Sequence, residues 1–236
     1  MNSLDIRNIN CFYGNTQVLW DVSLVIKSNE IVAVVGSNGA GKTTLLRAIS
    51  GLHKISRGSI LWGDKEIANI PPDLIVSRGI SQIPEGGGIF PYMTVVENLR
   101  VGAYLKRSWK KQREGLEKIF ILFPELERRK NQLAGTLSGG ERQMLGIGKG
   151  LMSSPQLLLL DEPSLGLSPK LVLKLFDGIK AIHQQGITIL LVEQNVYHAM
   201  TLSHTAYLLE NGRTLRGGSS KELMEDHHVK KAYLGL

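Results

Sequence analysis

The chain has 236 residues, of which 42% are hydrophobic, and this is long and apolar enough to bury a core and to exclude intrinsic disorder as its dominant state. Its single cysteine, Cys11, excludes an internal disulfide, and its net charge of +7 allows an acidic partner such as a nucleotide, a nucleic acid or an anionic membrane face. No run approaches 18 apolar residues, and the first residues lack the pattern of a signal peptide. We therefore expect a cytosolic protein that does not span a membrane.

Short apolar runs alternate with helix-length amphipathic stretches, which predicts an α/β domain with a largely parallel sheet. Residues 4–9 and 18–26 alternate around a turn at Tyr13-Gly14-Asn15, and residues 60–64 resemble a hairpin, so an antiparallel sub-sheet is expected first. Continuous apolar runs then predict strands covered on both faces. These strands are expected at residues 31–35, 157–160 and 187–192.

The middle of the chain is predicted to be helical. Between about residues 97 and 135 there is no strand signal, and no linker divides the chain into independent domains. Helices are expected at residues 44–50, 98–105, 110–123, 125–133 and 142–152. We predict a single domain over residues 1–236, with an inserted helical lobe at about 86–155 and a helical cap at about 219–236.

Residues 36–43, here called the phosphate loop, fit the pattern G-x-x-x-x-G-K-[ST] between a predicted strand and a predicted helix. Glycines let successive backbone N–H groups point inward, and the helix start adds partial positive charge where phosphates sit. Lys42 is expected to reach the β- and γ-phosphates, and the Thr43 hydroxyl is expected to bind Mg²⁺.

A strand that ends in two carboxylates follows later, at Asp161 and Glu162. In an α/β sheet this position lies at the carboxyl edge, where ligands bind. Asp161 suits a Mg²⁺ ligand, and Glu162 suits a base for an attacking water. The alternative is that both residues merely mark the end of a strand.

Residues 137–141, here called the signature segment, precede another predicted helix. Ser138 is a good N-cap, and Gly139 and Gly140 allow close backbone approach, so this helix start is a second candidate phosphate site. Taken alone, the segment also fits an ordinary capped helix.

These three motifs together resemble the ATP-binding cassette (ABC) ATPases, and the likeness extends from the turn at Tyr13 to the tail at residues 232–236. The resemblance implies a P-loop NTPase core with an antiparallel β sub-sheet and an inserted α-helical subdomain. In this family two subunits stack head to tail, with ATP between the phosphate loop of one and the signature segment of the other. Binding closes the pair and hydrolysis reopens it.

The resemblance also implies a role for each candidate residue. Tyr13 stacks on adenine, and the signature segment grips the γ-phosphate of the partner's ATP. The expected catalytic residues are Lys42, Glu162 and Gln194, and the expected Mg²⁺ ligands are Thr43, Glu85 and Asp161. The expected nucleotide contacts are Tyr13, Gly36, Ser37, Asn38, Gly39, Ala40, Gly41, Lys42, Thr43, Thr44, Ser138, Gly139 and Gly140.

Three positions depart from the general pattern of this family. Glu85 stands at the usual Q-loop glutamine, Gln194 at the switch histidine and Ser168 at the D-loop aspartate. A carboxylate at residue 85 can still bind Mg²⁺. An amide at residue 194 donates a hydrogen bond but cannot carry a histidine's charge, so we expect this chain's own site to be slow.

The segments Pro84-Glu85-Gly86, Ser164-Leu165-Gly166-Leu167 and Val192-Glu193-Gln194-Asn195 resemble one branch, the LivF-type ATPases of bacterial branched-chain amino-acid importers. That branch implies a second ABC ATPase subunit, integral membrane permeases, an extracytoplasmic substrate-binding protein and a position on the cytoplasmic face of the membrane. It tends to carry basic residues after Glu-Gly, where this chain has Gly87 and Gly88.

Other functions stay open. One alternative is an ATPase of a urea importer or a lipopolysaccharide exporter, and another is a nucleotide-binding regulatory subunit with little turnover. A DNA-maintenance ATPase would be expected to carry a long coiled-coil insertion, which is absent between residues 43 and 138. We therefore expect no nucleic-acid partner.

Overall fold

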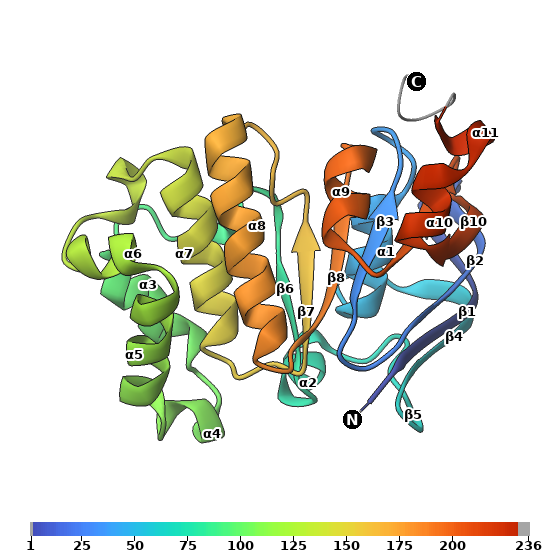
Figure 1. The fold of residues 1–236 in the computed structure, drawn as a ribbon. Helices are drawn as coiled ribbons and strands as arrows, with labels where there is room; N and C mark the ends of the chain where they lie inside the picture. Colours follow the sequence, from blue (N-terminus) through green and yellow to red (C-terminus); the bar gives the residue numbers. More distant parts are fainter. Residues whose placement is uncertain (1, 231–236) are drawn as a thin grey trace. The chain divides into compact units, whose positions relative to one another are not determined.

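The computed structural model describes residues 2–230, which divide into two compact units (Figure 1). The first unit comprises Met1–Ile75 and Thr188–Leu236, and the second comprises Val76–Ile187. Across the described part of the chain, none of the helices combines the length and the apolar character needed to cross a bilayer.

The first unit begins with an antiparallel sheet in the order β2-β1-β4-β5. Its strands are β1 (Leu4–Tyr13), β2 (Thr16–Ile26), β4 (Ile55–Trp62) and β5 (Lys65–Glu66). Leu4 pairs with Ile26 on one side and with Trp62 on the other, and all three side chains are buried. Apolar residues therefore gather on one face of this sheet, as the alternating pattern predicted.

The parallel part of the first unit is built on β3 (Ile31–Val35), in which every residue is buried. β3 pairs in parallel with β8 (Thr188–Glu193) and β9 (Thr205–Glu210), and β10 (Arg213–Ser219) runs antiparallel to β9. The helices of this unit are α1 (Lys42–Ile49), α9 (Val196–Leu202), α10 (Ser220–Glu225) and α11 (His227–Val229), while α2 (Pro72–Ser77) lies at the unit boundary.

The second unit contains two parallel strands, β6 (Ile80–Ile83) and β7 (Leu157–Asp161), and most of the helices. In chain order its helices are η1 (Glu85–Gly88), α3 (Val95–Gly102), α4 (Lys106–Trp109), α5 (Gln112–Leu122), α6 (Pro124–Arg128), η2 (Ala134–Thr136), α7 (Gly139–Leu151) and α8 (Pro169–Gln184).

The predicted strands at residues 31–35, 157–160 and 187–192 are confirmed to within one residue, but several helix boundaries were wrong. The helix predicted at 98–105 begins at Val95 because Thr94 caps it, and the one predicted at 142–152 begins at Gly139 because Ser138 caps it. The helix predicted at 125–133 ends at Arg128. Of the predicted C-terminal cap, α10 and α11 are seen, and residues 231–236 lie outside the described residues.

Candidate nucleotide-binding site

The phosphate loop of the first unit leaves β3 and enters α1, as its sequence predicted. The Lys42 Nζ donates hydrogen bonds to the carbonyl oxygens of Gly36 at 2.8 Å and Ser37 at 3.0 Å. Only 4% of Lys42 is exposed. The loop therefore curls around its own lysine and holds the positive charge at its centre.

The exposed part of this loop is its tip, at residues 37–39, whereas Gly36, Ala40 and Thr44 are buried and Thr43 is half-buried. α1 begins after Gly41, whose φ of 104° is left-handed, and no side chain caps the helix. Glycine adopts this conformation without the steric cost other residues incur. The first N–H groups of α1 thus have no capping side chain competing with a bound anion.

Gln194 lies beside the phosphate loop within the same unit. Val35 at the end of β3 pairs with Glu193 at the end of β8, and the Gly36 N–H donates to the Glu193 carbonyl at 3.4 Å. Gln194 follows directly and is exposed. The chain therefore places an amide at the edge from which the phosphate loop emerges.

Tyr13 at the end of β1 is 43% exposed and stacks on His53, with ring centroids 4.2 Å apart and planes 25° from parallel. His53 Nε2 is 3.0 Å from the Phe12 carbonyl oxygen, and Arg47 Nη1 donates to the Tyr13 hydroxyl at 3.5 Å. His53 could not be identified from the sequence as a partner of Tyr13, because it lies 40 residues further along the chain. Stacking on His53 orients the ring of Tyr13, the residue that is expected to contact adenine.

The acidic pair lies in the second unit, at the carboxyl end of β7. Asp161 is 3% exposed, and Glu162 is half-buried with a left-handed φ of 43°. Strained backbone of this kind concentrates at functional sites. Ile83 pairs with Leu160, so the exposed Glu85, two residues after β6, leaves the same edge of the two-stranded pair.

A lysine side chain from another element contacts the glycine-rich turn after Glu85. Lys149 of α7 donates a hydrogen bond to the Gly88 carbonyl and lies 4.9 Å from the centre of the Phe90 ring. Burial lowers the pKa of Lys149. Lys149 of α7 therefore places a basic group beside Gly88.

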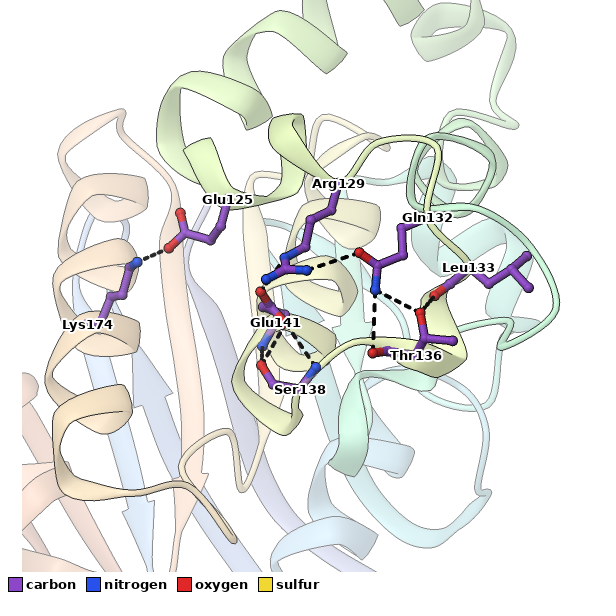
Figure 2. Close-up of polar contacts among 8 residues, drawn as sticks. All are labelled: Glu125, Arg129, Gln132, Leu133, Thr136, Ser138, Glu141 and Lys174. Carbon is purple, nitrogen blue, oxygen red and sulfur yellow. Dashed lines mark hydrogen bonds and ion pairs between the residues drawn. The ribbon is translucent and has the colours of Figure 1, made fainter.

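The signature segment forms a complete capping box at the start of α7 (Figure 2). The Ser138 hydroxyl and N–H donate to Glu141 Oε2 at 2.8 and 2.9 Å, and the Glu141 N–H donates to the Ser138 oxygen at 3.4 Å. Arg129 Nε is 2.7 Å from Glu141 Oε1. The spacing S-x-x-E could have predicted the box, whereas nothing in the sequence indicated Arg129.

The structure groups the predicted residues by unit. The first unit brings together Tyr13, the phosphate loop and Gln194, and the second holds Glu85, Asp161, Glu162 and the signature segment. Within residues 2–230 no group of three or more His, Cys, Asp or Glu side chains forms a metal site by itself. The candidate Mg²⁺ ligands are hydroxyl and carboxylate oxygens, which is the donor chemistry that Mg²⁺ prefers when phosphates complete its shell.

Comparisons with known proteins place the chain in a family. A family model described as "ABC transporter" matches residues 19–165. The chain belongs to the ABC transporter family. The predicted family is therefore confirmed, and this chain is of the ATPase type within it.

Individual relatives of this ABC ATPase match it over nearly its whole length. It is 43% identical to the high-affinity branched-chain amino acid transport ATP-binding protein BraG of Pseudomonas aeruginosa, over 98% of this chain and 99% of that one. It is 40% identical to a probable branched-chain amino acid transport ATP-binding protein, LivF, of Archaeoglobus fulgidus, over 97% of each.

A solved structure extends the likeness to the fold. The crystal structure of the ADP conformation of an ATP-binding cassette of an ABC transporter covers all of both chains with a TM-score of 0.84 at 27% identity. The predicted fold class, an α/β ABC ATPase with an antiparallel sheet, is confirmed.

Proposed function

We propose that this chain is the ATP-hydrolysing motor subunit of an importer for branched-chain amino acids. The observation that carries the proposal is its 43% identity to BraG over 98% of the chain. Glu85 and Gln194 support it, because both depart from the general family pattern in the way that resembles the branched-chain importer branch.

In this proposal the phosphate loop, Tyr13 and the acidic residues have different roles in one reaction. Lys42 and the N–H groups of α1 bind the phosphates, and Tyr13 stacks on adenine. Mg²⁺, when bound with ATP, neutralises charge on the phosphates, and Thr43, Asp161 and Glu85 are its proposed ligands. Glu162 orients and deprotonates the attacking water.

Gln194 is proposed to donate an amide hydrogen bond toward the γ-phosphate. Unlike histidine, an amide cannot become a cation, so it stabilises the developing negative charge less. This chain's own site is therefore proposed to be slow, and a partner subunit is needed for full turnover.

The proposed partners are a second ABC ATPase subunit, identical or different, and integral membrane permeases at the cytoplasmic face of the membrane. An extracytoplasmic substrate-binding protein acts indirectly. Phe90 and Tyr92, which are 45% and 92% exposed, are proposed to contribute to the surface of the second unit that docks on the permeases. Substrate specificity is proposed to reside in the other chains.

The test measures ATP turnover by the purified chain, first alone and then with candidate partner cassettes and permeases. The Glu162→Gln variant is the negative control. Low turnover that rises with branched-chain importer partners is the expected result. Turnover that does not depend on these partners would favour a homodimeric ATPase and weaken the assignment to the branched-chain importer branch. A Glu162→Gln variant that hydrolyses at the wild-type rate would contradict the assignment of the base.

Gln194→His tests the slow site separately. The variant is expected to raise the turnover of the homodimer, because an imidazole can carry charge next to the phosphate. Unchanged or lower turnover would show that the amide does not limit the reaction, and Asn195→Ala, which alters the neighbouring N-cap of α9, controls for a general disturbance of this segment.

A further inference from the structure

The hydroxyl of Ser138 is already used inside the chain. It donates to Glu141 Oε2 at 2.8 Å, and the same carboxylate oxygen accepts the Ser138 N–H at 2.9 Å. A serine hydroxyl has one proton to donate. To donate to a phosphate, Ser138 must therefore give up its bond to Glu141, which then needs another source of charge compensation.

That compensation is in place on the far side of the carboxylate, as Figure 2 shows. Arg129 Nε is 2.7 Å from Glu141 Oε1, and Arg129 Nη1 donates to Gln132 Oε1 at 3.1 Å. Gln132 in turn donates to Thr136 Oγ1 at 2.8 Å, and the Thr136 hydroxyl donates to the Leu133 carbonyl at 2.7 Å. The guanidinium is therefore oriented by a chain of side chains on the segment leading into the signature segment.

The charge on Glu141 is stabilised by these contacts. Burial raises the pKa of Glu141, but the hydrogen bonds from the Ser138 N–H and hydroxyl and the pairing with Arg129 lower it by more, so the pKa lies below its ordinary value. Glu141 is thus ionised at neutral pH, with 15% of its side chain exposed. Without a cation, such a carboxylate would repel any phosphate that approached the start of α7.

We propose that Arg129 is a positioning residue for the signature segment. It holds Glu141 against the backbone N–H of Ser138 and neutralises its charge, so that the Ser138 hydroxyl can move from Glu141 to the γ-phosphate of a partner subunit's ATP. This inference rests on the proposed function, in which the signature segment meets that ATP. Arg129 itself acts through Glu141 and touches no nucleotide.

The chain offers a matched control on α6, the short helix of which Arg129 is the C-cap. Glu125 of α6 forms an ion pair with Lys174 of α8, and its side chain is 10% exposed. Both ion pairs line one cavity of about 460 Å³ together with Ser138. Lys174→Met removes a cation and an ion pair from that cavity but leaves the capping box of Ser138 intact.

The experiment compares kcat and KM for ATP in the assembled transporter carrying wild type, Arg129→Met, Arg129→Lys, Lys174→Met, or Arg129→Met combined with Glu141→Gln. Arg129→Met is expected to lower kcat/KM by about tenfold or more, since it leaves Glu141 charged and unpaired. Lys174→Met should stay within about threefold of wild type, because the ion pair that it removes is not part of the capping box of Ser138 and Glu141. The kcat/KM of Arg129→Lys should fall between these two. Lysine keeps the positive charge, but it lacks the planar guanidinium with which Arg129 contacts Glu141 and Gln132 at the same time.

The double variant separates positioning from mere support of the fold. Replacing Glu141 by Gln removes the unpaired charge, so the double variant should recover most of the kcat/KM lost in Arg129→Met. Equal losses in Arg129→Met and Lys174→Met, or no recovery in the double variant at matched melting temperature, would overturn the proposal.

A second readout distinguishes failure of this inference from failure of the proposed function. ATP binding by the isolated chain uses its own phosphate loop, so Arg129→Met should leave it unchanged. A wild-type assembly that hydrolyses no ATP would contradict the proposed function. A wild-type assembly that hydrolyses ATP, with Arg129→Met equal to it, would overturn only the role of Arg129.

Discussion

Two helices of this chain begin where an anion is expected, and they differ in whether a side chain caps their first N–H groups. α1 follows Gly41, has no capping side chain and has no acidic residue in its first turn. α7 follows Ser138, which forms a complete capping box with Glu141. A carboxylate in the first turn stabilises a helix by itself but competes with a phosphate ligand.

The difference indicates that the two helix starts suit different kinds of anion binding. The open start of α1 suits a ligand that is bound directly and tightly, with Lys42 held at the centre of the loop. The closed start of α7 is stable without a ligand and must exchange an internal hydrogen bond to bind one. Such an exchange suits a contact that forms only when a partner subunit arrives.

The largest expected effect is at the open start. Lys42→Ala should lower ATP turnover by about 10²-fold or more, as does removal of a group that stabilises developing charge on a reacting oxygen. ATP binding by the isolated chain should weaken as well. Lys180→Ala, on an exposed position of α8, is the matched loss of one lysine and should change neither. Full turnover in Lys42→Ala would contradict the assignment of this loop.

The next largest effect is expected on stability, from a substitution of Gly41 at the start of α1. A Cβ at Gly41 would lie 2.6 Å from the Leu19 Cδ2, and its φ of 104° is strained for any other residue, so Gly41→Ala should lower the free energy of unfolding by about 1–3 kcal/mol. Urea unfolding measures the change.

Gly39→Ala is the control for that substitution, since Gly39 has a φ of 83° but no atom within 4 Å of its Cβ position. It carries the backbone strain without the contact with Leu19, and it should cost less. Equal losses in the two variants would show that the contact with Leu19 contributes nothing to the requirement for glycine.

Much of the first unit could be predicted from sequence, because the signals there are local. The buried strand at residues 31–35 and the phosphate loop follow each other within 13 residues, so composition and spacing were sufficient. The contacts that were missed join distant residues, such as Tyr13 with His53 and Gly88 with Lys149. The pairing of such residues is set by the register of strands and the packing of helices, which a single sequence does not specify.

The predicted helix boundaries failed for a different reason, because the signals that set them are local. The apolar periodicity of α3 and α7 located both helices, but Thr94 and Ser138 set their first residues through hydrogen bonds. Both segments carry the pattern S/T-x-x-E, so these starts were readable from sequence. Arg129 was not, because its role depends on the fold of residues 129–136.

Ser138→Ala and Thr94→Ala compare two capping boxes of the same type. Each substitution removes the N-cap hydroxyl and should lower the free energy of unfolding by about 1 kcal/mol. Only Ser138→Ala should also reduce ATP turnover in the assembled transporter, since the box of α3 is not proposed to meet a nucleotide. Equal turnover in the two variants would show that the start of α7 is an ordinary capped helix.

The smallest expected effect is the pH dependence of the closed start. Because the pKa of Glu141 is lowered below its ordinary value of 4.5, its contacts stabilise the fold fully above that pH and lose this contribution as the pH falls through the lowered pKa. The difference in unfolding free energy between wild type and Glu141→Gln should therefore be largest near pH 7 and shrink below pH 4.5. The sign follows from the unfolded chain, which takes up the proton first as the solution is acidified. A difference that grows on acidification would mean that burial, rather than the bonds from Ser138 and Arg129, dominates the carboxylate, and the two helix starts would then no longer differ in the way their hydrogen bonds indicate.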